Sequence, residues 1–212
     1  MKDMNEKISQ GGPCILIGTQ MLAKGHDFKH ITSVFVLDTD AELFHPDFKS
    51  QERLGQLLTQ VAGRGGRGIS SSEIFLQTYY PNHPLLEKLT NGNYKEFLQE
   101  IGKEREITSM PPFSFVTLIR ANSVNEKNVV DFLDLVKKMV ERVEPQSPQN
   151  QYLGPIPSML EKRAGRYRYN FQIKTHTRSK MHILLTKLIE QLSKTKSFSN
   201  VRWSIDVDPI EL

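Results

Sequence analysis

Cysteine is almost absent from this sequence: Cys14 is the single one among 212 residues. One thiol cannot form a disulfide within the chain, and it excludes any all-cysteine metal site. Cys14 directly precedes a short apolar run, so we interpret it as a small buried side chain. A chain without internal disulfides suits a reducing, cytoplasmic setting, which is the localisation that we expect.

Long hydrophobic stretches are missing as well. No apolar run approaches the roughly 18 residues needed to cross a bilayer, and residues 1–12 lack the apolar centre of a signal peptide. We therefore expect a soluble protein with no membrane partner. A chain of 212 residues has room for one large domain or two small ones.

Two signatures of nucleotide hydrolysis are also missing. The sequence contains no Gly-x-x-x-x-Gly-Lys-Ser/Thr loop, which would cradle phosphates. It contains no Asp-Glu-x-His box, which would bind a metal ion or activate water. This polypeptide by itself therefore offers no recognisable site for a triphosphate and magnesium.

Positive charge, by contrast, is concentrated in one region. The whole chain has 28 basic and 24 acidic residues, a formal net charge of +4. Residues 161–180 hold seven basic residues against Glu161, so this window alone is 7 − 1 = +6. Such clustering indicates an anionic partner more strongly than the overall charge does. The basic residues are Lys162, Arg163, Arg166, Arg168, Lys174, Arg178 and Lys180.

The first half of the chain has the pattern of a parallel α/β sheet. Residues 15–17 and 34–37 are short apolar runs, and uninterrupted runs predict strands buried on both faces. Residues 74–76 are a third strand candidate. Polar residues follow the first two runs at 18–20 and 38–40, where ligands collect beyond strand ends in open α/β sheets. We interpret Asp38 and Asp40 as carboxylates of a turn at the sheet edge.

Helical spacing follows in residues 50–62, where leucines and a valine recur every three or four positions. Residues 63–68 are rich in glycine, so we expect the helix to end there. Further helices are expected from about Pro84 and over residues 93–107. Pro111 and Pro112 cannot continue a helix, and they divide the chain into domains 1–110 and 111–212.

The second domain alternates between strand and helix patterns in the order βαββαβ, a split βαβ sandwich of the α+β class. A hairpin is predicted between residues 152–160 and 166–175, around residues 163–165. Val201, Trp203, Ile205 and Val207 alternate with polar residues and predict a half-buried final strand. We expect Asp206 and Asp208 to be structural and to bond a nearby arginine.

Two glycine-rich stretches carry chemistry. Residues 60–67, Gln-Val-Ala-Gly-Arg-Gly-Gly-Arg, hold two arginines three residues apart, and guanidinium groups stabilise charge on a transferring phosphoryl group. Residues 18–28, Gly-Thr-Gln-Met-Leu-Ala-Lys-Gly-His-Asp-Phe, lie about forty residues upstream. A basic turn at a helix end is the alternative if residues 60–67 are considered alone.

Together these stretches resemble motifs VI and V of superfamily 2 helicases. With Leu-Asp-Thr-Asp at 37–40 and Asp-Val-Asp-Pro-Ile-Glu at 206–211, the chain from about residue 15 onward resembles the C-terminal part of the PriA family of replication-restart helicases. The resemblance implies the distal part of a RecA-like lobe 2, followed by the βαββαβ domain. Gly65-Gly66 departs from the family's more usual Ala-Gly pair.

The resemblance also implies site residues in the first domain. Arg64 and Arg67 would stabilise charge on ATP as catalytic arginine fingers, and Gln60 would face the nucleotide with them. Gly25 and Asp27 match the nucleotide-facing part of motif V. The positions nearer the DNA strand are Thr19, Gln20 and Lys24.

Cofactors follow from the family rather than from this chain. ATP, magnesium and zinc are implied for the longer proteins, but the phosphate loop, acidic box and zinc cysteines are all missing here. We therefore expect no ATP hydrolysis by this polypeptide alone. The implied activity of the longer protein is ATP-driven 3′-to-5′ DNA unwinding at stalled forks, with primosome assembly. The alternative is a non-enzymatic nucleic-acid-binding or docking module.

The basic hairpin is the second candidate site. Arg163, Arg166 and Arg168 are interleaved with tyrosines, a mixture that suits single strands and junctions. On a strand, however, Tyr167 and Tyr169 would face away from the arginines, so the aromatic rings are alternatively core residues. We predict that the three arginines bind the DNA backbone.

Partners are likewise implied by the resemblance. The family contacts branched or forked DNA, other primosome proteins and the acidic tail of single-stranded DNA-binding protein. Arg178 matches the family's arginine for the carboxylate of that tail, which a guanidinium suits physically. No metal site is predicted: His26 and His30 lie four apart, but Asp27 stands where the zinc motif requires glutamate.

Overall fold

The structure is a computed structural model that describes residue 13 and residues 15–19, 32–65, 73–195 and 198–211. The chain divides into two compact units, Met1–Glu104 and Arg105–Leu212, called unit 1 and unit 2 below. The proline pair at 111–112 thus lies near the beginning of unit 2. Within the described ranges, no helix is both long and apolar enough to cross a membrane.

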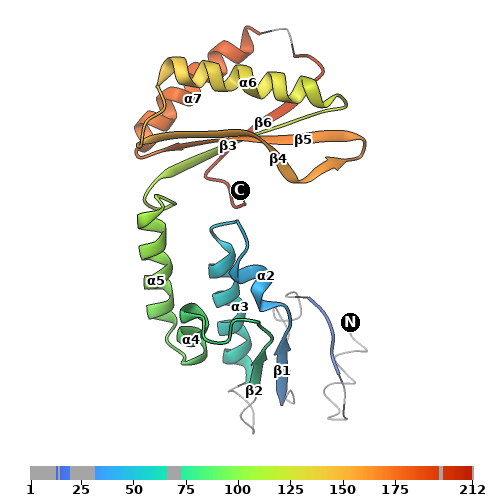
Figure 1. Cartoon of the computed structure of the whole chain (residues 1–212), viewed down its shortest axis with the longest axis vertical. Coiled ribbons are helices and arrows are strands. Elements are labelled where there is room, and N and C mark those ends of the chain that lie inside the picture. Colours follow the sequence, from blue (N-terminus) through green and yellow to red (C-terminus); the bar gives the residue numbers. More distant parts are fainter. Residues whose placement is uncertain (1–12, 14, 20–31, 66–72, 196–197, 212) are drawn as a thin grey trace. The chain divides into compact units, whose positions relative to one another are not determined.

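Unit 1 contains a parallel pair of strands. β1 (Ser33–Val36) pairs with β2 (Glu73–Leu76), and Ser33 lies opposite Glu73 (Figure 1). The strands predicted at 34–37 and 74–76 are therefore confirmed to within one residue at either end. The helices of this part of the chain are α2 (Thr39–Leu43), α3 (Ser50–Gly65), α4 (Pro84–Thr90) and α5 (Tyr94–Ile107), which crosses into unit 2.

A small helical core holds unit 1 together. Leu54 and Leu58 of α3 are 1% and 7% exposed, as their spacing predicts. Gly55 lies between them, and a Cβ atom added there would come within 2.3 Å of the Phe97 ring of α5. The glycine therefore permits close contact between α3 and α5. The buried hydrophobic residues of this core are Leu43, Leu54, Leu58, Leu85, Leu86, Phe97 and Ile101.

The prediction that the strand at residues 34–37 is buried on both faces is wrong. Phe35 is 65% exposed and Phe75 45% exposed, and their rings stack with centroids 4.8 Å apart. The other face of the pair is better covered, because Val36 and Leu76 pack against the helical core. A sheet buries its second face only when a further layer covers it, which the strand sequence cannot show.

The strand predicted at residues 15–17 is also wrong. This segment has no regular secondary structure, and Ile15 and Ile17 are 91% and 90% exposed. An apolar run becomes a strand only where a neighbouring strand offers hydrogen bonds, and among the described residues none pairs with it. Helix α2 was not predicted. It begins after Asp38, whose left-handed φ of 53° turns the chain away from β1.

Unit 2 has the predicted βαββαβ order and an antiparallel sheet. The strands lie in the order β4-β5-β3-β6, so the first and third strands of the unit are central. Both helices cover the same face of the sheet (Figure 1). The elements are β3 (Phe115–Ser123), α6 (Glu126–Val143), β4 (Asn150–Arg163), β5 (Arg166–Thr175), α7 (Arg178–Ser193) and β6 (Arg202–Val207).

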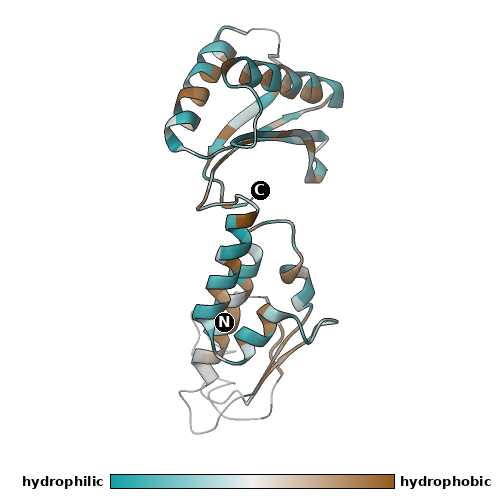
Figure 2. Ribbon diagram, turned by 60° about the vertical axis from the view of Figure 1, so that its left-hand side comes forward, coloured by the Kyte–Doolittle hydropathy of each residue, from teal (hydrophilic) through white to brown (hydrophobic). Residues whose placement is uncertain are grey.

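Local sequence explains the helices and the hairpin of unit 2. Asn125 caps α6 by accepting a hydrogen bond from the Lys127 amide at 2.9 Å. Ala164 and Gly165 connect β4 to β5 with φ values of 50° and 73°, the left-handed geometry of a tight hairpin turn. Figure 2 shows hydrophobic and hydrophilic residues alternating along both helices, as their apolar stripes predict.

The core of unit 2 lies between its sheet and its helices. Phe171 and Ile173 of β5 are 0% exposed, as are Val129 and Leu133 of α6. The final strand is less buried than predicted: Trp203 is 40% and Val207 54% exposed. β6 is an edge strand, so its side chains have neighbours on one side only.

Candidate nucleic-acid interface

The sheet of unit 2 has one face covered by helices and one face that they leave open. Side chains alternate between these faces along each strand, so the strand register assigns them. The open face, as defined here, is predominantly polar and basic. Its polar residues are Arg120, Asn122, Gln151, Arg163, Arg166, Arg168, Asn170, Gln172, Lys174, Arg202, Ser204 and Asp206.

The three hairpin arginines predicted to bind DNA lie on this open face. Arg163 and Arg166 are directly opposite each other at the turn, and Arg168 lies opposite Asn122 of β3. Arg166 donates to Asn122 twice, from Nε to Oδ1 at 2.6 Å and from a terminal nitrogen to the carbonyl oxygen at 3.1 Å. These bonds orient a guanidinium without neutralising it, because Asn122 is uncharged.

No acidic side chain among the described residues forms an ion pair with any of the hairpin arginines. Arg163 is exposed, and Arg166 and Arg168 are half-buried. Uncompensated guanidinium groups on an accessible surface attract phosphate oxygens, which they grip with two parallel donors.

The tyrosines between those arginines belong to the core side. Tyr169 is 8% exposed, and its hydroxyl donates to the carboxylate of Glu126 and, at 3.4 Å, to that of Glu161. The pKa of Tyr169 is raised to about 12, mainly by the hydrogen bond to Glu126 and to a smaller extent by burial. Tyr167 packs partly against the same core. The alternative in which the rings are structural is therefore confirmed for Tyr169, and stacking on nucleic-acid bases is not available to it.

Two further arginines of the open face were missed by sequence reasoning, whereas Lys174 belongs to the basic cluster already recognised in the sequence. Arg120 comes from β3 and Arg202 from β6, far from the hairpin in sequence but opposite Asn170 and Asn122 across the sheet. Lys174 donates to the Thr108 carbonyl at 3.3 Å, and burial lowers its pKa. A signal did exist, because Arg120 interrupts an otherwise apolar strand.

Arg178 occupies the first position of α7. Its side chain is 75% exposed and forms an ion pair with Asp208 at 3.4 Å. Its guanidinium carbon lies 5.2 Å from the centroid of the Phe115 ring, a cation–π contact. Asp206 likewise pairs with Arg120 at 3.2 Å. The prediction that Asp206 and Asp208 bond nearby arginines is confirmed.

The structure describes only three of the residues predicted from motifs V and VI, namely Thr19, Gln60 and Arg64. Gln60 is exposed on α3, Thr19 is exposed in a segment without regular structure, and Arg64 lies in the last turn of α3, with its side chain not described. The remaining predicted positions lie outside the described residues, and so do both histidines of the rejected zinc motif. They are Gln20, Lys24, Gly25, Asp27 and Arg67.

The predicted turn with carboxylates is present at the ends of β1 and β2. Asp40 accepts hydrogen bonds from the Thr78 hydroxyl at 2.5 Å and from the Tyr79 amide at 2.8 Å. These bonds tie the chain after β1 to the chain after β2. Asp38 and Gln77 line the same hollow of about 210 Å³. Among the described residues, no group of three or more histidines, cysteines or carboxylates could hold a metal ion.

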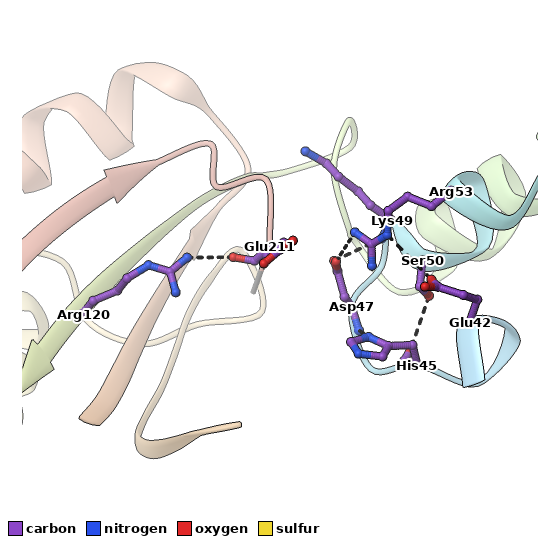
Figure 3. Close-up of polar contacts among 8 residues, drawn as sticks. All are labelled: Glu42, His45, Asp47, Lys49, Ser50, Arg53, Arg120 and Glu211. Atoms are coloured by element: carbon purple, nitrogen blue, oxygen red, sulfur yellow. Dashed lines mark hydrogen bonds and ion pairs between the residues drawn. The ribbon is translucent and has the colours of Figure 1, made fainter. Parts of the chain in front are cut away.

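A second polar cluster in unit 1 fixes the start of α3. Asp47 is 4% exposed, accepts from the Lys49 amide at 3.2 Å and pairs with Arg53 at 2.6 Å (Figure 3). Glu42 approaches the same guanidinium at 3.7 Å. His45 accepts from the Asp47 amide through Nδ1. The cluster therefore positions the helix whose far end carries Arg64.

Comparison with known proteins relates this sequence to one family. Residues 106–210 match the family model of the primosomal protein N C-terminal domain. The replication restart protein PriA of Haemophilus influenzae is 39% identical over 98% of this chain and 28% of its own length. The PriA proteins of Synechocystis sp. and Bacillus subtilis are 34% and 33% identical over 98% of this chain and 24% and 26% of their own.

This chain thus spans about a quarter of the length of these relatives. Among solved structures, the de novo designed protein Foldit4 is 17% identical with a TM-score of 0.33, covering 45% of this chain and 99% of its own. That likeness is too low to support an argument. The matches over nearly the whole sequence and over residues 106–210 show that the chain belongs to the PriA family of replication restart proteins.

Proposed function

We propose that this chain is the C-terminal part of an ATP-dependent 3′-to-5′ DNA helicase that recognises stalled replication forks and begins primosome assembly. Within it, unit 2 binds the phosphates of branched DNA through its open face. The observation that carries the proposal is the set of hairpin arginines, which lie together on that face and have no acidic partner among the residues that the structure describes. The relatives' name, replication restart protein, supports the same role.

Unit 1 contributes the distal part of a RecA-like lobe in this proposal. Its parallel strands and the crossover through α3 support that assignment, because parallel pairing with helical crossovers defines such lobes. Gln60 and Arg64 belong to the last turns of α3. In this proposal they face ATP that is bound by another part of the longer protein. Magnesium would be held there with ATP, and zinc would be bound elsewhere in that protein.

Arg178 is proposed to receive the acidic tail of single-stranded DNA-binding protein. Its exposure supports this role, because a carboxylate can approach the guanidinium from solvent. The non-enzymatic alternative predicts the same DNA binding by unit 2. A measurement of ATP hydrolysis by the longer protein distinguishes the two functions, because only the helicase hydrolyses ATP.

The DNA-binding role can be tested by replacing Arg163, Arg166 and Arg168 with glutamine. Each lost phosphate contact should reduce the dependence of log K on log salt by about 0.9. We expect the slope for forked DNA to fall by about two to three, with roughly ten- to hundredfold weaker binding at low salt. Fluorescence anisotropy across a salt series measures both quantities.

The matched control replaces Lys127, Lys138 and Lys187 with glutamine. The control has the same net charge as the arginine variant, because each loses three positive charges. The three lysines are exposed on α6 and α7, so their replacement leaves the open face intact. Its slope should stay close to that of the unaltered chain. Equal slopes for the arginine variant and the lysine variant would show that binding follows net charge alone.

A further inference from the structure

An acidic segment begins in the last two residues of β6 and continues beyond that strand. Residues 206–211, Asp-Val-Asp-Pro-Ile-Glu, contain three carboxylates, and this stretch is called the acidic segment below. Asp206 is the one acid among the described residues of the open face, where every other charged residue is an arginine or lysine. The segment thus brings negative charge to a surface that is otherwise positive.

The backbone of this segment returns to the open face. Asp206 lies opposite Leu118, which places its side chain on that face. The Asp208 amide donates to the Val116 carbonyl at 3.0 Å, and Asp208 has a left-handed φ of 53°, which changes the direction of the chain. The Glu211 carbonyl then accepts a hydrogen bond from Arg120 at 2.9 Å (Figure 3).

Two arginines of unit 2 are occupied as a result. Arg120 contacts Asp206 at 3.2 Å as well as the Glu211 carbonyl, and Arg178 contacts Asp208 at 3.4 Å. The side chains of these ion pairs are between 36% and 75% exposed. Arg120 lies on the open face, and Arg178 lies at the start of α7 beside the Phe115 ring. Exposed pairs are weak and are screened by salt, so a polyanion that reaches these arginines can replace the pairs.

We propose that the acidic segment is an internal competitor, which occupies Arg120 and Arg178 until single-stranded nucleic acid displaces it. The inference rests on the proposed DNA binding by the open face. At Arg120 a nucleic acid fits better than an acidic peptide, because the basic row continues from Arg120 through Arg168 and Arg202 on three neighbouring strands. Regularly spaced phosphates can contact such a row along its length.

The test neutralises the two carboxylates of the segment that form ion pairs, without changing the segment's shape. The variant Asp206→Asn/Asp208→Asn in the whole 212-residue chain keeps the side-chain size and loses both ion pairs. The control Asp131→Asn/Glu190→Gln neutralises two exposed carboxylates of α6 and α7, on the covered side of the sheet. Both variants gain two units of positive charge, so a general charge effect is equal in each.

Binding of a short oligo(dT) is then measured by anisotropy across a salt series. We expect the segment variant to bind about three- to tenfold more tightly at low salt. In this variant Arg120 and Arg178 have no ion pair that must break before they bind phosphate. Its slope should be unchanged or steeper by up to roughly 1.4, since single strands contribute about 0.7 per phosphate. The control should change affinity less than twofold.

A second measurement detects the displacement itself. Hydrogen exchange of the Asp208 amide in the unaltered chain should become faster when oligo(dT) binds, because its bond to Val116 would be released. Equal affinities of the segment variant and the control, or slower exchange on binding, would overturn the competitor while leaving DNA binding intact. No binding by any of the three proteins would overturn the proposed function and the competitor with it.

Discussion

The two units of this chain bury their sheets to different extents. In unit 2, two helices cover one face of four strands, and Phe171 at its centre has no exposed surface. In unit 1, two strands carry Phe35 and Phe75 with much of their surface in solvent. Similar apolar strand sequences therefore lead to different burial, because the covering layer and not the strand determines it.

This difference matters for the two candidate sites. The arginines of the open face rest on a sheet whose opposite side is packed, so their spacing is set by strand register within unit 2 alone. Of the nucleotide-facing arginines proposed for unit 1, Arg64 lies in the last turn of a single helix, and its proposed role requires a second lobe. Unit 2 can therefore be tested as a binding surface in this chain.

The largest expected effect comes from replacing one buried phenylalanine in the core of each unit. Phe171→Ala should destabilise unit 2, and Phe97→Ala unit 1, by about 3–5 kcal/mol each, because both rings are fully buried. Trp203, the single tryptophan, lies in unit 2 and reports its unfolding. In urea, tryptophan fluorescence should shift its midpoint for Phe171→Ala and not for Phe97→Ala. A shift of equal size in both variants would mean that the units unfold as one.

A smaller effect is expected from two helical glycines. Gly55→Ala should cost about 1–3 kcal/mol, because the new Cβ atom meets the Phe97 ring at 2.3 Å. Gly102→Ala in α5 has open space around it and should stabilise the helix by roughly 0.5–1 kcal/mol. Far-UV circular dichroism during unfolding measures both. If Gly55→Ala stabilised the chain as Gly102→Ala is expected to do, the prediction would be wrong. That result would show that α3 and α5 separate readily.

The smallest effect in ordinary buffers concerns alkaline pH. Burial raises the pKa of Tyr152 to about 12, with Glu144 and Glu141 adding to it, and Tyr169 is also raised to about 12. The unfolded chain releases these protons near pH 10, its usual tyrosine value. The stabilisation of unit 2 is thus fully present below pH 10 and is lost as the pH rises through 12.

The double variant Tyr152→Phe/Tyr169→Phe should lack most of this alkaline loss. Urea unfolding followed through Trp203 at pH 9 and pH 11 compares the two proteins. Lys174 acts in the opposite direction, because burial lowers its pKa, and its contribution to stability grows as the pH rises. An identical decline in the unaltered chain and the variant would assign the alkaline loss to other groups.

Sequence periodicity alone determined much of unit 2. Strand and helix patterns predicted the βαββαβ order, and the hairpin predicted around residues 163–165 turns at Ala164 and Gly165. Such signals are local, because helix period and turn geometry depend on neighbouring residues. The facing of the hairpin arginines and tyrosines followed from strand alternation in the same way.

Tertiary structure decided what depends on distant partners. It left residues 15–17 without a strand, exposed one face of β1 and β2, and gathered Arg120 and Arg202 beside the hairpin arginines. Strand pairing joins residues many positions apart, so no local pattern reveals which strands are neighbours or which side chains of distant strands share a face. The sequence by itself therefore named the basic hairpin, and only the paired sheet defined the surface to which it belongs.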